Sequence, residues 1–174
     1  MIKHSEPFAT IPSASTGRLG GPVVPDVTTV RGVLAALSGA SLVAAVGGSG
    51  LLAALGLVDH ARDWDVTTDA DPRLVEAALA VARIPFTRGP SGDGRFATCA
   101  RLCVDGGDHD IDVIVGLALR VGESVERLPT RITGCWLGLP LADPAVWARA
   151  YRLMGRPGPA DLLDTWLAKK PAVE

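Results

Sequence analysis

Two short motifs in the first half of the chain carry residues that could do chemistry on phosphates. Gly47-Gly48-Ser49 follows an apolar run, and a turn of small residues leaves backbone N–H groups free to hold phosphate oxygens. Thirteen residues separate Ser49 from Asp63-Trp64-Asp65. On a strand, two carboxylates at positions i and i+2 point to the same side, where they can share a divalent cation. A phosphate cradle beside such a pair is what nucleotidyl transfer needs.

A third motif, which is again acidic, follows in the segment 109–115. If this segment is a strand, the apolar side chains at positions 111, 113 and 115 face the core, while Asp110 and Asp112 project the other way. A third carboxylate on an adjacent strand would complete a set of oxygen ligands for Mg²⁺. His60 and His109 lie near these motifs, and we interpret both as surface histidines in loops.

The order of these motifs resembles a known family. An apolar strand, Gly48-Ser49, Asp63-Trp64-Asp65 with an apolar neighbour, and a later aspartate between apolar residues are similar to the motifs of the polymerase-beta-type nucleotidyltransferase superfamily. Within it, the small bacterial members resembling lincosamide and aminoglycoside nucleotidyltransferases are the most similar. The resemblance covers residues 43–115 and is looser elsewhere.

The resemblance implies roles for individual residues. The Gly48 backbone and the Ser49 hydroxyl would hold the triphosphate of a nucleoside triphosphate (NTP). Asp63 and Asp65 would bind Mg²⁺ or Mn²⁺, and Asp112 would share the metal and help to deprotonate an acceptor hydroxyl. Asp110 is the competing choice, and we prefer Asp112 because apolar residues flank it on both sides, as in the family pattern.

The C-terminal region departs from the family pattern. Many small members carry an Arg-x-Lys-Asp run before their last helix, and Arg156 and Asp161 have plausible counterparts there, but residues 158–160 contain no lysine. Arg156 or Arg152 would then be the cation at the phosphates, or Arg156 is a structural partner of Asp161 or Asp164. The missing lysine favours a second hypothesis, an inactive binding or regulatory protein such as a toxin–antitoxin component. The three aspartates favour the enzyme, because unused metal ligands would repel one another without benefit.

These residues must be positioned by a mixed β-sheet with flanking helices, an α/β (α+β) fold with a nucleotidyltransferase-like core. We expect residues 1–24 to be a flexible N-terminal arm and residues 25–174 to be a single domain ending in short helices. Asp-Pro pairs at 71 and 143 predict two helix starts. The apolar patterns predict helices over 26–39, 51–57, 71–82, 143–155 and 160–169, and strands over 41–46, 62–68, 84–87, 95–104, 110–115 and 131–139.

Composition limits the partners. The 174 residues are 48% hydrophobic with a net charge of −2, which predicts a globular domain without a broad surface for nucleic acid. No apolar run is long enough to span a membrane, the first ten residues lack the apolar core of an export signal, and three cysteines fit a reducing compartment, so we expect a cytoplasmic protein without membrane contact. The partners would be an NTP and a small-molecule or protein acceptor. With about sixty residues after the core motifs, acceptor recognition would rest on the last helices, the N-terminal arm or the second subunit of a homodimer.

Overall fold

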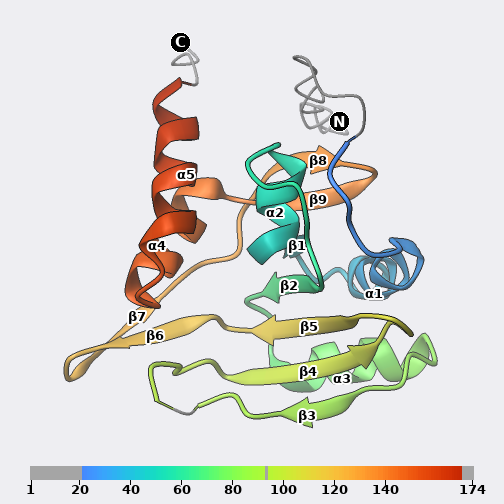
Figure 1. Cartoon of the computed structure of the whole chain (residues 1–174). Coiled ribbons are helices and arrows are strands. Elements are labelled where there is room, and N and C mark those ends of the chain that lie inside the picture. Colours follow the sequence, from blue (N-terminus) through green and yellow to red (C-terminus); the bar gives the residue numbers. More distant parts are fainter. Residues whose placement is uncertain (1–20, 93, 170–174) are drawn as a thin grey trace, which may run out of the picture.

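A mixed seven-stranded sheet with helices on both faces forms the body of the protein (Figure 1). The computed structural model describes residues 21–92 and 94–169. Strand order across the sheet is β3-β4-β5-β2-β1-β9-β8, and β6 and β7 form a separate two-stranded sheet. The strands are β1 (Ala44–Val46), β2 (Trp64–Thr68), β3 (Thr87–Gly89), β4 (Ala100–Asp105), β5 (Asp110–Val115), β6 (Ala118–Val121), β7 (Ser124–Arg127), β8 (Ile132–Trp136) and β9 (Leu139–Ala142). This confirms the predicted fold class.

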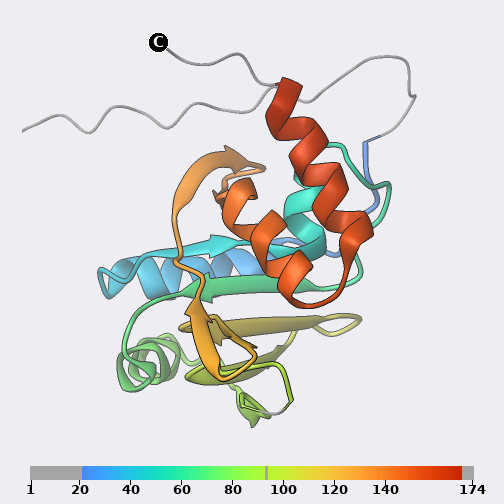
Figure 2. The same ribbon diagram turned by 90° about the vertical axis from the view of Figure 1, so that its left-hand side faces the viewer.

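The helices form two layers. Helices α1 and α3 pack against each other on one face of the sheet, and α2, α4 and α5 lie on the other side (Figure 1, Figure 2). They are α1 (Thr28–Gly39), α2 (Gly48–Ala54), α3 (Pro72–Val81), α4 (Pro144–Leu153) and α5 (Pro157–Lys169). The Asp-Pro starts are confirmed, because the Asp71 carboxylate accepts a hydrogen bond from the Arg73 N–H and that of Asp143 from the Ala145 N–H, both at 2.8 Å.

The centre of the sheet brings the acidic motifs together. Strand β2 is antiparallel to β1 and parallel to β5. In the β2–β5 register, Asp65 lies directly beside Asp112. Neighbouring strands are about 4.8 Å apart, so residues 47 positions apart in sequence become lateral neighbours on one face.

Several elements differ from the sequence-based prediction. The hairpin β6–β7 was not predicted at all. The predicted strand 131–139 is a hairpin, because Leu137 and Gly138 adopt left-handed conformations (φ 51° and 76°) that reverse the chain between β8 and β9. Helix α2 begins at Gly48, earlier than expected. Helix α1 begins at Thr28, two residues later than expected, and its N-cap residue Val27 makes no side-chain cap bond.

Only the last four residues of the predicted N-terminal arm, 21–24, belong to the described structure. Residues 1–20 of the expected arm lie outside the described residues. Val23 is bound to the body, since its N–H donates to the Asp59 carbonyl at 2.8 Å and its carbonyl accepts from the Ala61 N–H at 3.0 Å. None of the helices within residues 21–169 has the length and apolar character needed to cross a membrane.

Candidate active site

A hollow of about 780 Å³ lies between the sheet and the helices α2, α4 and α5. Its floor is made by strands β2, β4 and β5 and its far wall by the C-terminal helices. The lining includes five of the polar side chains that the sequence named as candidates, namely Ser49, Asp63, Asp65, Asp112 and Arg156, whereas the alternatives Asp110 and Arg152 do not line it. The three aspartates preferred from the sequence therefore face one space.

The glycine turn is shaped around the carboxylate of Asp65. Gly48 has a left-handed conformation (φ +54°), and a Cβ placed there would overlap the Asp65 carboxylate. A Cβ at Gly47 would overlap the ring of Trp147 in the same way. The Ser49 hydroxyl donates to Asp63 Oδ1 at 3.2 Å. The turn is thus in contact with the aspartates that follow it in the sequence.

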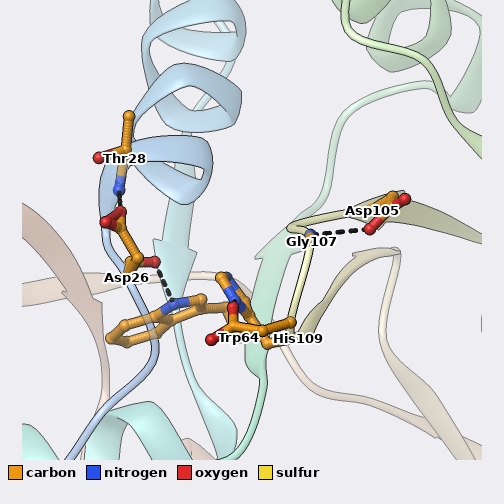
Figure 3. Close-up of polar contacts among 7 residues, drawn as sticks. Asp26, Thr28, Trp64, Asp105, Gly107 and His109 are labelled. Atoms are coloured by element: carbon orange, nitrogen blue, oxygen red, sulfur yellow. Dashed lines mark hydrogen bonds and ion pairs between the residues drawn. The ribbon is translucent and has the colours of Figure 1, made fainter.

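Trp64 fixes the orientation of the aspartate pair. Its ring is fully buried, and its indole N–H donates to the carbonyl of Asp26 at 3.2 Å (Figure 3). The Asp26 carboxylate in turn accepts from the Thr28 N–H at 2.5 Å at the start of α1. Because side chains alternate along a strand, burying Trp64 on the core side turns Asp63 and Asp65 toward the hollow, as the alternation in the sequence predicts.

The carboxylate of Asp65 is under electrostatic strain. Burial raises its pKa to about 7, and the negative charges of Asp63 and Asp112 add to the shift. Arg101 and Arg156 oppose it. A carboxyl group that resists ionisation beside two other carboxylates marks a position where a bound cation would relieve the repulsion.

Arg101 is a site residue that the sequence reasoning missed. Its guanidinium donates to Asp112 Oδ2 at 2.5 Å. The other oxygen of this carboxylate, Oδ1, is buried and has no hydrogen-bond partner among the described residues. Arg101 pairs with Ile114 across the β4–β5 hairpin, which puts it on the same face of the sheet as Asp112. The position of Arg101 therefore cannot be predicted without knowing the register of this hairpin.

The aspartates suit a hard divalent cation. The donor set consists of carboxylate oxygens, which Mg²⁺ and Mn²⁺ prefer, and the buried Oδ1 of Asp112 lacks a partner. Within the described part of the chain, however, no three His, Cys, Asp or Glu side chains already stand close enough together to hold a metal ion. The three aspartates therefore supply the type of ligand atom that such an ion prefers. One of these oxygens, Asp112 Oδ2, is engaged in the ion pair with Arg101.

The two C-terminal arginines have different surroundings. Arg152 forms the ion pairs with Asp164 and, at 3.7 Å, with Asp161. Arg156 instead lies over the ring of Tyr151, 5.1 Å from its centroid, and lines the hollow. The structural pairing considered for Arg156 is thus made by Arg152. Burial and the charge of Asp65 raise the pKa of the Tyr151 hydroxyl.

The remaining polar candidates, Asp110, His60 and His109, differ in exposure and in whether they line the hollow. Asp110 is exposed at the start of β5 and does not line the hollow. His60 is exposed and does line it. The interpretation of His109 as a surface residue is wrong. Its side chain is buried, its Nδ1 lies 2.7 Å from Asp108 Oδ1, and a Cβ placed at Gly106 would overlap its ring, so the turn before it packs directly against the imidazole.

Comparisons with known proteins identify the architecture. Neither a protein-family model nor a curated protein sequence matches this chain. Among solved structures, a Thermotoga maritima protein assigned as a nucleotidyltransferase superposes with a TM-score of 0.57 at 17% identity, over 83% of this chain and 93% of that one. The solution structure of the antibiotic-resistance factor ANT(2'')-Ia superposes with a TM-score of 0.55 at 18% identity, covering 81% of this chain and 83% of that one. A crystal structure of ANT(2'')-Ia with adenylyl-2''-tobramycin gives a TM-score of 0.50 at 18% identity, covering 81% and 88%.

The structural similarity extends over most of both chains in each comparison. At 17–18% sequence identity, it supports a conclusion about the fold alone. The chain has a nucleotidyltransferase-like fold.

Proposed function

We propose that this protein is a divalent-metal-dependent nucleotidyltransferase that moves a nucleoside monophosphate from an NTP, such as ATP, to a hydroxyl group of a small molecule or protein. The observation that carries the proposal is the register of Asp65 beside Asp112 in a hollow that also contains Ser49 and Asp63. On a nucleotidyltransferase-like fold, this arrangement combines a place for phosphates with a place for a cation.

The side chains divide the work of holding the nucleotide. Gly48 and Ser49 would hold the triphosphate, since the glycine leaves room for close approach and the serine offers a hydroxyl. Arg156 would add a positive charge from the connection between α4 and α5, where its guanidinium lies over the ring of Tyr151. Asp63, Asp65 and Asp112 would hold Mg²⁺ or Mn²⁺, which when bound neutralises the phosphate oxygens and withdraws charge from the α-phosphorus.

Asp112 is the group best suited to receive the proton of the acceptor hydroxyl. Arg101 fixes its carboxylate through Oδ2 and leaves Oδ1 buried without a partner. An acceptor hydroxyl that donates to Oδ1 would be oriented toward the nucleotide, and its proton would pass to this oxygen as the O–P bond forms.

The structural neighbours support an adenylyl transfer to a small molecule as the form of the reaction to test first. One of them was solved with adenylyl-2''-tobramycin. We assign the reaction to the cytoplasm, because Cys99, Cys103 and Cys135 are all free thiols.

Transfer of label from each α-³²P-NTP, with Mg²⁺ and a panel of hydroxyl acceptors, tests the proposal. We expect label on an acceptor together with release of pyrophosphate, and loss of both in an Asp63→Asn/Asp65→Asn double variant. Metal-dependent nucleotide binding without transfer to any acceptor would instead favour the regulatory protein. The absence of metal-dependent nucleotide binding would contradict both.

A further inference from the structure

A second hollow adjoins the candidate active site, beneath the β6–β7 hairpin. It has a volume of about 690 Å³ and is lined by residues of the hairpin and of the loop before β4. The loop and the hairpin are joined by backbone bonds, since the Ala97 N–H donates to the Ala118 carbonyl at 2.9 Å and the Arg120 N–H to the Arg95 carbonyl at 2.7 Å. Figure 1 shows this loop running beside the hairpin at one end of the sheet.

The hairpin presents two arginines to this hollow. Ala118 pairs with Arg127 and Arg120 with Val125, so these four side chains share one face of the hairpin and the arginines are diagonal neighbours. Both arginines line the hollow. Neither forms an ion pair with any described residue, and the described lining contains no carboxylate.

The opposite face of the hairpin holds it in place. Leu119 is fully buried in the core. Glu126 accepts two hydrogen bonds from the guanidinium of Arg149 on α4, at 2.7 and 2.6 Å. The hairpin is therefore anchored through one face, and its arginine face has a defined position relative to the active-site wall.

Thr98 connects the two hollows. It is 6% exposed and lines both of them. Its hydroxyl oxygen is buried and lacks a hydrogen-bond partner among the described residues, and a buried hydroxyl without a partner costs free energy that a ligand atom could recover. Two unpaired guanidinium groups and an unsatisfied hydroxyl are the donors that a phosphate or carboxylate group accepts.

We propose that the hollow at Arg120, Arg127 and Thr98 is the subsite for an anionic group of the acceptor, so that the acceptor is a small hydroxyl compound bearing a phosphate or carboxylate. This inference rests on the proposed function. Thr98 lies five positions before Cys103, the residue opposite Asp112, which is on the order of 15 Å of extended chain. The acceptor is accordingly elongated, with its hydroxyl at Asp112 and its anionic group at the hairpin. A polyamine acceptor such as tobramycin would meet like charge here.

Binding of inorganic phosphate tests the subsite without turnover. We expect amide NMR shifts at positions 98, 120 and 127 on titration with phosphate, and at least a roughly tenfold weaker response in an Arg120→Gln/Arg127→Gln variant, because charge-assisted bonds are removed. The matched control is Arg73→Gln/Arg131→Gln, which removes the same charge away from both hollows and should bind phosphate as the wild type does. Shifts that are absent at these positions, or equal in all three proteins, would overturn the subsite.

Titration with Mg–ATP separates this inference from the function on which it rests. We expect all three proteins to bind Mg–ATP alike. If phosphate binds at the hairpin but Mg–ATP binds to none of them, the proposed function fails and the anion site remains. If Mg–ATP binds and phosphate does not, the inference alone fails.

Acceptor turnover then tests the chemical class. We expect a hexose phosphate to exceed its parent hexose and tobramycin in kcat/KM by about tenfold or more, and the double variant to lose this preference through KM. A preference for tobramycin, or transfer to an RNA oligonucleotide alone, would contradict a small anionic acceptor.

Discussion

Asp65 is the residue on which the electrostatics of the site converge. It contacts the glycine turn, is two positions from Asp63 in the sequence and lies beside Asp112 in the sheet, and its pKa is raised to about 7 mainly by burial. The spacing of Asp63 and Asp65 was enough to predict that both would face one side of a strand. The contribution of Arg101 could not be predicted, because it depends on the β4–β5 register.

The raised pKa of Asp65 predicts a pH-dependent stability. The folded state keeps a proton up to about pH 7, whereas the unfolded chain loses it near 3.8, so between these values the folded state binds more protons. The free energy of unfolding should therefore fall as pH rises from about 4 to 7, by at most about 4 kcal/mol, and level off above that range. Urea denaturation across this pH range measures it, with Asp65→Asn, which lacks this proton, as the reference. Parallel curves for the two proteins would contradict the assignment.

Asp112 and Asp110 offer a matched pair of substitutions. They lie on one strand with the same orientation, yet only Asp112 lines the hollow and bonds to Arg101. We expect Asp112→Asn to lower the rate of nucleotidyl transfer by roughly 10²- to 10⁴-fold, the range for loss of a general base. Asp110→Asn should stay within about twofold. A larger loss of rate in Asp110→Asn than in Asp112→Asn would show that Asp110, not Asp112, is the general base.

At the scale of elements, the site is built where β1 turns into α2 and where α4 meets α5. The helices with Asp-Pro starts were predicted well because a cap and a fixed proline φ are local signals. The hairpin β6–β7 was missed because only Ala118 and Leu119 of its eight residues are buried and three of the eight are charged, so its apolar alternation is weak. Strand 131–139 was read as continuous because its turn uses Leu137, a residue that seldom adopts a left-handed conformation.

The glycine turn gives a test in which backbone strain is held constant. Gly48 and Gly56 both have positive φ, but a Cβ at Gly48 meets Asp65 whereas one at Gly56 meets nothing within 4 Å. Gly56→Ala should cost about 1–2 kcal/mol of stability for the left-handed conformation and leave nucleotide affinity unchanged. Gly48→Ala should cost a further 1–3 kcal/mol for the overlap and weaken Mg–ATP binding at least tenfold. Equal effects on binding in calorimetry would show that the turn does not shape the site.

The α4–α5 junction gives the complementary test. Arg156→Gln should weaken Mg–ATP binding by about tenfold, since one charge-assisted contact is lost, with little change in Tm. Arg152→Gln should leave the affinity unchanged and lower stability by less than about 1 kcal/mol, because its ion pairs are half-exposed. Loss of affinity only in the Arg152 variant would exchange the two roles.

At the scale of the whole molecule, the fold gathers residues from four distant segments into one hollow. Apolar patterns, the glycine turn and two acidic motifs were sufficient to predict the fold class, and the structural neighbours have the same fold at 17–18% identity. The pairing order of the strands and the basic hollow under β6–β7 could not be predicted, since both depend on contacts between segments far apart in sequence.

Calorimetric titration of the wild type with each NTP, in Mg²⁺ and then in EDTA, tests most directly whether the aspartates of the hollow bind a nucleotide together with a metal ion. We expect binding that requires Mg²⁺ and is weakened at least tenfold in Asp63→Asn/Asp65→Asn, while Arg73→Gln/Arg131→Gln binds as the wild type does. Equal binding with and without Mg²⁺, or equal binding by wild type and the aspartate variant, would contradict it.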